Sequence, residues 1–304
     1  MNGGLGISIT DVDPHLLRTF LAVADTGSFS AAAHRLRYTQ SAVSQQVAAL
    51  EADLGTPLFT RRPVAPTPAG ERLRRHAELL LVRLEAARAD VTRAIAPPGR
   101  LIVGLTPLAW SGPVAVALAA IRAASARLRT RVRVADRDRI VEAVATGEID
   151  LGLVDGFTAL NDPLRLPEPG AGGPRALGVT ESPAVVAVPV AHPLARRSSV
   201  DLADLADAYW IDAPEVAPFA RLPIDGLRAG LRYDGADAAV LAGLVAGGHG
   251  LAVLSAPLVA AHPGLAGVPF GTPRLVHRVE LLRLPAAVAD EPAERLAALL
   301  SAGT

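Results

Sequence analysis

The stretch YTQSAVSQQVAALE, residues 38 to 51, decides how the N-terminal part of this chain is interpreted. Apolar residues recur there at spacings of four, three and four, which predicts a helix starting after an N-cap at Thr39 and ending before Gly55. They are Val43, Val47, Leu50 and Leu54. Because residues four apart lie above one another on a helix, the other face is flat, neutral and polar. It carries Gln40, Ser41, Ser44 and Gln45.

Two further helices are predicted before this stretch. Residues 14 to 24 begin with Pro14, which suits a first helical position. They carry Leu17, Phe20, Leu21 and Ala24 at helical spacing. TGSFSAAAHRL breaks at Gly27, restarts at an N-cap, Ser28, and places Phe29, Ala32, Ala33 and Leu36 on one face. Two short helices joined by a tight turn are typical of a helix-turn-helix, whose second helix enters the DNA major groove N-terminus first.

The chemistry of the polar face suits base reading. Gln can bond to both N6 and N7 of adenine, and Ser can bond to base edges or phosphates. Arg61 and Arg62 lie in the Pro-rich segment TRRPVAPTPAG, which predicts a short wing that places guanidinium groups on phosphate. The expected DNA-binding residues are Ser28, Thr39, Gln40, Ser41, Ser44, Gln45, Arg61 and Arg62. The alternative is a helical bundle with a solvated polar surface.

Amino-acid composition limits the class of protein to which this chain can belong. The 304 residues are half apolar and 20% charged, which favours about two globular domains. Cysteine is absent, which excludes disulfides and thiolate metal or redox sites within these residues. The N-terminus lacks the features of a signal peptide and no apolar run reaches membrane-spanning length, so we expect a soluble cytoplasmic protein without a membrane partner.

The charges are unevenly distributed. Net charge is zero, and all thirty basic residues are arginine. Residues 14 to 77 hold eight arginines against four acidic residues, a balance of +4, so the remainder sums to −4. A modest positive excess on the predicted DNA-reading part is consistent with a phosphate-bearing partner.

Between residues 69 and 94 the apolar spacing becomes four, three, four, three and four, which indicates a coiled-coil-like seam. The residues are Leu73, Ala77, Leu80, Leu84, Ala87 and Val91. We expect dimerisation through Leu73, Leu80, Leu84 and Val91. The alternative is a helix that packs on its own domain. APPG at residues 96 to 99 should end the helix and form a hinge.

Three motifs, LRTFLAVADTGSFSAAAHRL, TQSAVSQQVAALEADLGTPLF and PTPAGERL, together resemble the N-terminal signature of LysR-type transcriptional regulators. The resemblance continues through HPLA, SVDLADLADAYWI and LAGLVAGGHGLAVL. It implies a winged helix-turn-helix over residues 1–68, a dimerising linker helix over 69–96 and an effector domain over 97–304. The wing from Phe59 to Thr67 is about two residues shorter than usual for the family, and prolines in residues 212–230 make a continuous helix there unfavourable.

The effector domain alternates strand-like and helix-like segments, which predicts parallel α/β structure. Lobe I is expected at about 100–156 and 266–304, with LIVGL, RVRVA, IDLGLV and VELLRL as strands, helices from about Pro107 and Asp138, and a last helix over 291–300. A Pro- and Gly-rich loop at 161–174 should lead into lobe II, about 157–265, which contains AVVAVPV and LAVLS. The two lobes resemble type 2 periplasmic binding proteins, with a ligand cleft between them. The predicted class is α+β overall, with an all-α N-terminal domain.

Cleft residues should lie where strands end and helices begin. Thr106 follows LIVGL, and the resemblance implies an effector-contacting hydroxyl there, although a simple N-cap is the alternative. Trp110 could flank the ligand or fill the core. Arg137, Asp155 and Asp212 also follow strands, and each could instead form a salt bridge or face solvent. Together they would suit an effector with both an amino and a carboxylate group, unless the three pair with one another.

Catalytic signatures are absent from the sequence. GGHGLAVLS lacks the nucleophile-elbow pattern and instead predicts a helix end followed by a strand. The seven histidines have no metal-ligand spacing, and no phosphate-loop or dinucleotide fingerprint occurs. We therefore expect no catalytic residue, no metal and no cofactor. The predicted function is a homo-oligomeric regulator that binds double-stranded operator DNA and responds to a small-molecule effector. The alternative is a small-molecule-binding protein or enzyme with an incidental helical N-terminal domain.

Overall fold

The computed structural model describes residues 13–95, 99–125, 127–166, 173–205, 207–218, 228–272, 274–284 and 291–302. The chain divides into two compact units, Met1–Val91 and Thr92–Thr304. Each unit is built around its own buried apolar clusters. The hinge predicted at 96–99 lies outside the described residues apart from Gly99.

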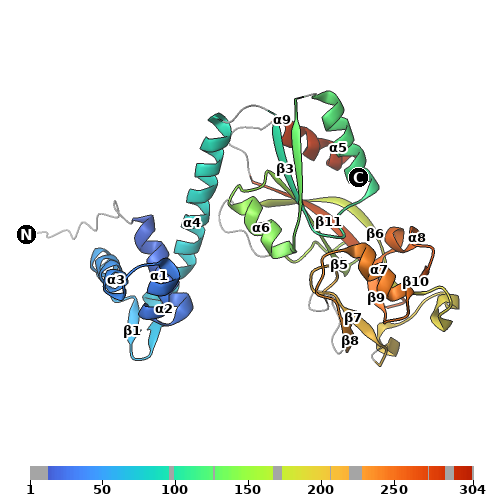
Figure 1. The fold of residues 1–304 in the computed structure, drawn as a ribbon, viewed down its shortest axis with the longest axis horizontal. Helices are drawn as coiled ribbons and strands as arrows, with labels where there is room; N and C mark the ends of the chain where they lie inside the picture. The colour runs from blue at the N-terminus through green and yellow to red at the C-terminus, as the bar shows by residue number, and fades with distance from the viewer. Residues whose placement is uncertain are drawn as a thin grey trace, which may run out of the picture. The chain divides into compact units, whose positions relative to one another are not determined.

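The N-terminal unit contains the helices expected from the sequence (Figure 1). They are α1 (Pro14–Thr26), α2 (Phe29–Leu36) and α3 (Gln40–Leu54). Each begins after a side chain that accepts a backbone N–H in its first turn, namely Asp13, Ser28 and Thr39. Gly27 and Gly55 end α1 and α3 in the left-handed region, at φ 61° and 65°. Local capping chemistry therefore fixes these boundaries.

The three helices share one apolar core. Phe20, Val43 and Leu50 are fully buried in it, and Phe59 closes one side with its ring 5.2 Å from that of Phe20. Strands β1 (Phe59–Arg61) and β2 (Val64–Pro66) form an antiparallel hairpin. The Pro-rich segment therefore forms the expected wing as a two-stranded hairpin, so the winged unit is not made of helices alone.

Helix α4 (Pro68–Ile95) follows the wing. The Thr67 hydroxyl accepts the N–H of Gly70 at 3.1 Å and so caps its first turn. A long helix therefore follows the wing, starting one residue earlier than predicted.

In the second unit, two helical layers cover the sheet of lobe I. Helices α5 (Gly112–Ala124) and α9 (Glu291–Ala302) pack on one face, and α6 (Arg137–Ala145) packs on the other. Successive residues of strand β3 (Arg100–Leu105) face opposite layers, as Leu101 and Ile102 do. The strands are β3 (Arg100–Leu105), β4 (Arg129–Val134), β5 (Leu151–Ala159) and the partly shared β6 (Arg175–Pro189) and β11 (Leu275–Arg283).

Lobe II is built on the far half of β6. Strands β9 (Ala252–Ser255) and β10 (Leu265–Pro269) pair with it there, and Trp210 is fully buried in the core. The other elements of the lobe are η2 (Pro193–Arg196), η3 (Leu202–Leu205), β7 (Trp210–Asp212), β8 (Ala229–Arg232), α7 (Ala238–Ala246) and α8 (Ala256–Ala260). Figure 1 shows α7 and α8 beside these strands. As predicted, GGHGLAVLS is a helix end followed by a strand.

The crossings between lobes differ from those expected. Strand β6 begins in lobe I, where residues 175–183 pair with β11, and enters lobe II at residue 184. The chain returns between β10 and β11, several residues after 266. The Pro- and Gly-rich loop therefore does not mark the boundary, because one long strand carries the chain through both lobes. In residues 213–218 the structure shows turns rather than helix, and 219–227 lie outside the described residues.

Candidate DNA-binding face and ligand pocket

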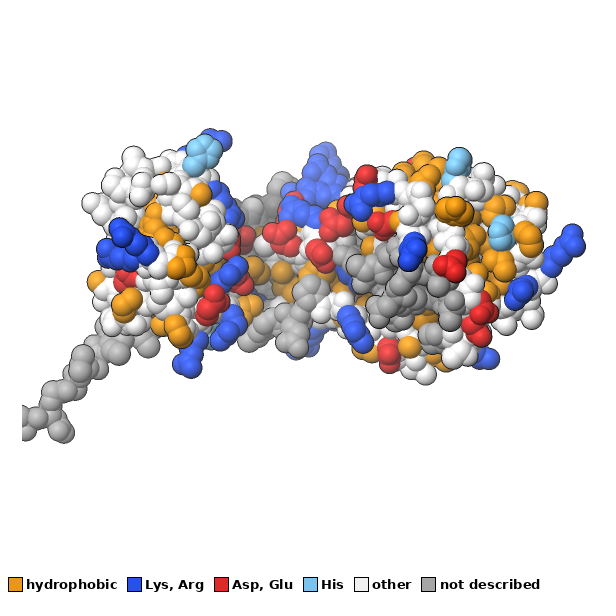
Figure 2. Space-filling view, turned by 90° about the horizontal axis from the view of Figure 1, so that it is seen from below, with side chains coloured by type: hydrophobic (Ala, Val, Ile, Leu, Met, Phe, Trp, Pro, Cys, Tyr) orange, Lys and Arg blue, Asp and Glu red, His pale blue; other side chains and the backbone are white. Residues whose placement is uncertain are grey.

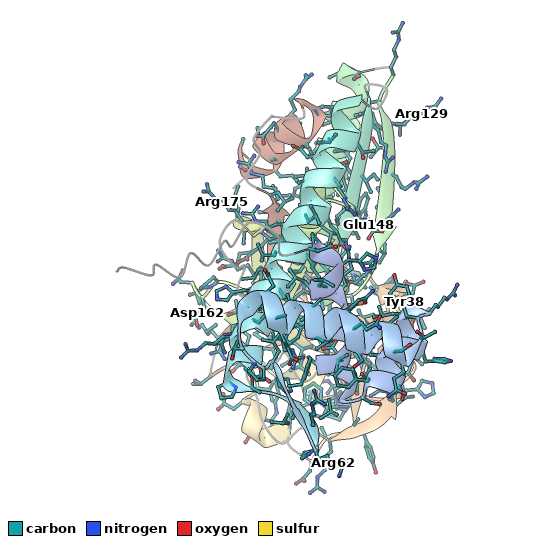
Figure 3. All side chains as sticks on the ribbon, turned by 90° about the vertical axis from the view of Figure 1, so that its left-hand side faces the viewer. Tyr38, Arg62, Arg129, Glu148, Asp162 and Arg175 are labelled. Carbon is teal, nitrogen blue, oxygen red and sulfur yellow. The ribbon has the colours of Figure 1, made fainter. Side chains whose placement is uncertain are left out.

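The polar face of α3 is exposed along its whole predicted length. Gln40, Ser41, Ser44 and Gln45 are all exposed, whereas Val43, Val47 and Leu50 on the opposite face are at most 3% exposed. In Figure 3 the helix lies across the face turned to the viewer, with Tyr38 at one end and Arg62 at the hairpin tip. The structure thus leaves both the predicted helix face and the wing arginines exposed.

Ser28 and Thr39 cap the N-termini of α2 and α3. The Ser28 hydroxyl accepts the N–H of Ala31 at 3.3 Å, and the Thr39 hydroxyl accepts that of Ala42 at 3.2 Å. Thr39 also lies 3.0 Å from the hydroxyl of Ser41. These two predicted contact residues therefore first serve to start α2 and α3.

Three side-chain interactions that sequence reasoning missed hold α3 in place. The Thr19 hydroxyl, fully buried on α1, donates to Gln46 Oε1 at 2.7 Å. Glu51 Oε1 accepts the N–H of Leu58 at 2.7 Å, which ties the end of α3 to the wing. Ser30 on α2 donates to Gln40 Oε1 at 3.1 Å. The only sequence signal was that polar Gln46 and Glu51 adjoin the apolar stripe of α3.

The wing places two arginines at its turn. The Thr60 hydroxyl donates to the carbonyls of Pro63 and Ala65, at 2.7 and 3.1 Å, and so braces the hairpin. Arg61 and Arg62 are exposed, and neither forms an ion pair with another described residue. Figure 2 views the side on which the hairpin projects in Figure 1, and arginine side chains stand out on this face of the N-terminal unit. These guanidinium groups can therefore meet phosphates.

Part of the basic excess counted from the sequence is neutralised. Arg35 and Arg74 both pair with Asp25 at 3.1 Å, and Arg18 lies 3.5 Å from Glu85. The other five arginines of residues 14–77 form no ion pair with a described residue and keep their positive charge. They are Arg37, Arg61, Arg62, Arg72 and Arg75.

The predicted seam on α4 is divided. Leu73 packs against the core of its own unit, and Ala77 is fully buried in that core, so the alternative of intrachain packing holds for this first part. Further along, Leu80 and Val91 are 55% and 65% exposed, and Leu84 is half-buried. Only the second part of the seam is left available to a partner.

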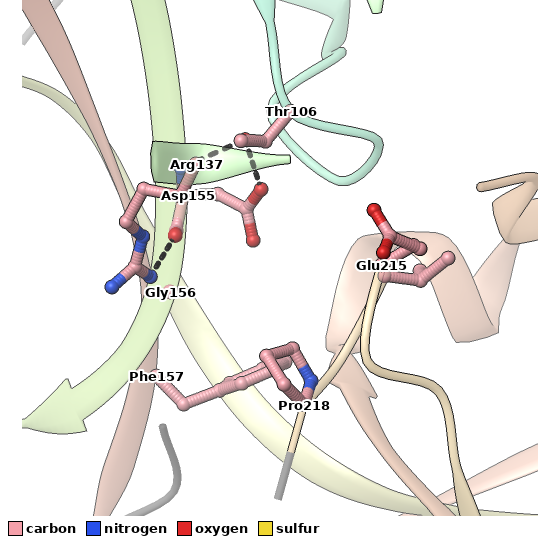
Figure 4. Close-up of a pocket in the computed structure, with 8 residues that line it drawn as sticks. Thr106, Arg137, Asp155, Gly156, Phe157, Glu215 and Pro218 are labelled. Atoms are coloured by element: carbon pink, nitrogen blue, oxygen red, sulfur yellow. Dashed lines mark hydrogen bonds between the residues drawn. The ribbon is translucent and has the colours of Figure 1, made fainter. Parts of the chain in front are cut away.

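A small pocket lies between the two lobes of the second unit (Figure 4). Lobe I contributes Thr106 just after β3, residues 155–157 within β5 and the start of α6, and lobe II contributes the turn after β7. The lining residues are Thr106, Arg137, Asp155, Gly156, Phe157, Glu215, Val216 and Pro218. The empty space inside it is about 330 Å³ and includes open solvent, so the enclosed part of the pocket is far smaller.

Asp155 is the centre of a buried polar cluster at this pocket. Its carboxylate accepts from the Thr106 hydroxyl and lies 3.1 Å from Nε2 of His277, and the backbone N–H of Asp155 donates to Thr106 at 3.0 Å. All three side chains are about 5% exposed or less. Thr106 is therefore not an N-cap, and its hydroxyl instead fixes one wall of the pocket.

Arg137 occupies the space beside Gly156. Its guanidinium donates to the backbone carbonyl of Asp155, and a Cβ on Gly156 would overlap it. Figure 4 shows this guanidinium at the edge of the pocket, while the carboxylates of Asp155 and Glu215 point inward from opposite walls. The structure thus brings Thr106, Arg137 and Asp155 to one pocket.

Trp110 and Asp212 do not line this pocket. Trp110 is 53% exposed, so it does not fill the core. The helix expected from Pro107 begins only at Gly112, because residues 107–108 form a turn and Ser111 with Pro113 provides the helix start. Asp212 instead forms an ion pair with Arg232 at 3.1 Å. Asp234 first, and Asp212 to a lesser extent, raise the pKa of Arg232.

Sequence reasoning missed Glu215 and His277. Glu215 lies in a turn without secondary structure, and His277 lies in the middle of β11, far along the chain from Asp155. Neither position follows a strand that precedes a helix, which was the signal used. Within the described residues, no group of three or more His, Asp or Glu side chains is placed to hold a metal ion.

Two family models match nearly the whole chain. Residues 14–71 match the bacterial regulatory helix-turn-helix protein model of the lysR family, and residues 95–304 match the LysR substrate binding domain model. The chain belongs to the LysR family. This LysR-family protein is a DNA-binding transcription regulator that responds to a small-molecule effector, and oligomerisation is typical of the family.

Among relatives of this LysR-family regulator is the probable hydrogen peroxide-inducible genes activator of Mycobacterium avium. It is 30% identical over 296 residues, which cover 93% of this chain and 92% of the relative. The HTH-type transcriptional regulator HdfR of Yersinia pestis is 37% identical over 142 residues, 46% of this chain and 48% of the relative. These relatives are transcriptional regulators rather than enzymes.

Solved structures of LysR-family proteins share the fold. A single-substitution variant of full-length OxyR from Pseudomonas aeruginosa has a TM-score of 0.53 at 21% identity, covering 95% of this chain and 100% of that one. CbnR has a TM-score of 0.53 at 21% identity, covering 96% and 99%. In the part of the LysR-family chain that the structure describes, no helix is long and apolar enough to span a membrane.

Proposed function

We propose that this regulator reads operator DNA with the exposed face of α3, in the cytoplasm, as a homo-oligomer that presents two recognition helices to two half-sites. The observation that carries this proposal is the division of α3 into a buried apolar face and an exposed face of Gln and Ser side chains. Such a face can enter the major groove closely and bond to base edges. An effector in the interlobe pocket acts by binding one arrangement of the oligomer better than another.

Arg61 and Arg62 supply phosphate contacts in this proposal. Changing both to Ala should weaken binding to every DNA and flatten the plot of log K against log salt concentration by about two units, because two fewer counterions are released. Fluorescence anisotropy over a salt series measures the slope. Arg129 and Arg131, which are exposed on β4, provide a control of equal charge when both are changed to Ala. An unchanged slope for the wing variant would place both guanidinium groups in solvent.

The pocket favours an effector that carries an amino or other cationic group. Asp155 and Glu215 both face the cavity, whereas the single guanidinium of Arg137 is engaged by a backbone carbonyl. From the sequence, the amino group of the effector was expected to pair with Asp155 and Asp212. We now propose Asp155 and Glu215 as its partners. The carboxylate part of the expected effector has less support, because two carboxylates and one guanidinium line the pocket.

A calorimetric panel of small amines, amino acids, plain carboxylic acids and neutral aromatics tests this effector class. An amine-bearing ligand should bind best, and Glu215→Gln should weaken it by about tenfold, or about 1.4 kcal/mol, through loss of a charge-assisted contact. Asp212→Asn is the matched control, since Asp212 lies outside the pocket. Tighter binding of plain acids, or an equal effect of both variants, would contradict the proposal.

We propose that the pocket binds without catalysing. The cluster of Thr106, Asp155 and His277 superficially resembles a catalytic triad, but its order is wrong. The carboxylate lies between the hydroxyl and the imidazole, so the hydroxyl donates to Asp155 and no base is placed to activate it. The cluster therefore orients the pocket wall, and the absence of cysteine from the 304 residues rules out switching by thiol oxidation within them.

A further inference from the structure

Ser30 and Gln40 form a contact between the two helices of the helix-turn-helix motif. Ser30 lies in the first turn of α2, and Gln40 is the first residue of α3. The Ser30 hydroxyl donates to Gln40 Oε1 across 3.1 Å, and both side chains are exposed on the surface. This hydrogen bond orients the amide of Gln40, with Oε1 toward α2, at the end of α3 that would enter the groove first.

The orientation of this amide decides which base it can read. The oxygen and the nitrogen of a primary amide lie on opposite sides of its carbon, so holding Oε1 against α2 turns Nε2 away from α2. An amide that offers only N–H groups suits guanine, which presents the acceptors N7 and O6 in the major groove. Adenine presents N7 and an N6 donor, and its full recognition requires the amide oxygen as well.

We infer that Ser30 is a specificity-determining positioning residue, which makes Gln40 a donor-only reader and directs it to guanine rather than adenine. Ser30 acts through Gln40 and contacts no base itself. The inference rests on the proposed entry of α3 into the major groove.

Gln45 provides an internal contrast. It lies on the same exposed face of α3, yet among the described residues its side chain forms no hydrogen bond. Its amide is free to rotate and to bond to adenine through both oxygen and nitrogen. Two glutamines on one helix face are thus prepared for different bases, and the difference comes from a residue on the preceding helix.

The test is selection from a pool of random-sequence duplexes by the full-length protein and its variants. The variants are Ser30→Ala, Ser30→Thr, Gln40→Ala and Gln45→Ala. Gln40→Ala identifies the base pair read by Gln40, because preference disappears there, and Gln45→Ala should leave that position unchanged. The wild type should favour guanine over adenine at that position by about fivefold or more. Ser30→Ala should move the preference to adenine, and Ser30→Thr, which keeps the hydroxyl, should retain guanine.

The outcomes distinguish failure of the role of Ser30 from failure of the proposed entry of α3 into the major groove. If Gln40→Ala and Gln45→Ala change no base preference, the entry of α3 into the groove is wrong. If Gln40→Ala removes a preference that Ser30→Ala leaves untouched, or the wild type selects adenine there, the role of Ser30 is wrong. A merely structural Ser30 would alter stability or overall affinity without moving the preference at one base pair. Because Ser30 is exposed and Ala favours helix, the folded state should tolerate the change.

Discussion

Replacing Leu80 and Val91 together by Asp should separate the regulator into monomers and reduce operator affinity by about a hundredfold to ten-thousandfold. Both side chains are large, apolar and more than half exposed in the single chain, at 55% and 65%. They lie on the second part of the α4 seam, whose spacing matches a helix pair. Charges facing each other across a two-fold contact would be buried without partners. A monomer also loses the gain from binding two half-sites at once.

Sedimentation velocity of the full-length chain measures this dissociation directly. Leu79→Asp is the matched control, because Leu79 is an apolar residue of the same helix, 43% exposed, that lies outside the seam spacing. The control should sediment like the wild type. The seam proposal fails if the double variant keeps the native sedimentation coefficient at the same concentration. Folding should be little affected, since neither residue is buried within its own chain.

The N-terminal unit could be predicted almost completely because its signals are local. A cap such as Thr39 acts within one helical turn, and the apolar stripe of α3 shows its buried face directly. The wing also formed where expected. The contacts that hold α3 to its neighbours were not predictable, because a polar residue such as Gln46 looks the same in a sequence whether it faces solvent or a buried Thr19.

The pocket shows where sequence reasoning ends. Thr106 and Arg137 were found because the ends of parallel strands meet at one edge. Asp155 was chosen by the same rule, but β5 runs on to Ala159, so Asp155 lies inside the strand rather than after it. Asp212 satisfies the same rule but ends a strand of the other lobe, where Arg232 neutralises it. Glu215 reaches the pocket through a turn, and His277 reaches Asp155 through the pairing of β11 with β5, so both join distant parts of the chain. No local pattern carries that information.

The other prediction of large effect concerns base reading. Gln40→Ala combined with Gln45→Ala should remove two base contacts, each worth about 1 to 3 kcal/mol of discrimination, so the operator should lose about thirtyfold to ten-thousandfold if the two add. Random DNA is held by phosphate contacts that these changes leave in place. Its affinity should therefore change little. Both residues are exposed, so no buried packing is lost.

The most direct measurement is a pair of titrations at one fixed salt concentration. Wild-type protein and the Gln40→Ala, Gln45→Ala double variant are each titrated with a duplex selected by the wild type and with a random duplex of equal length. If α3 reads the operator, the ratio of selected to random affinity falls by about thirtyfold or more, while random binding stays within about twofold. An equal loss on both duplexes, or an unchanged ratio, would show that this face of α3 does not read bases.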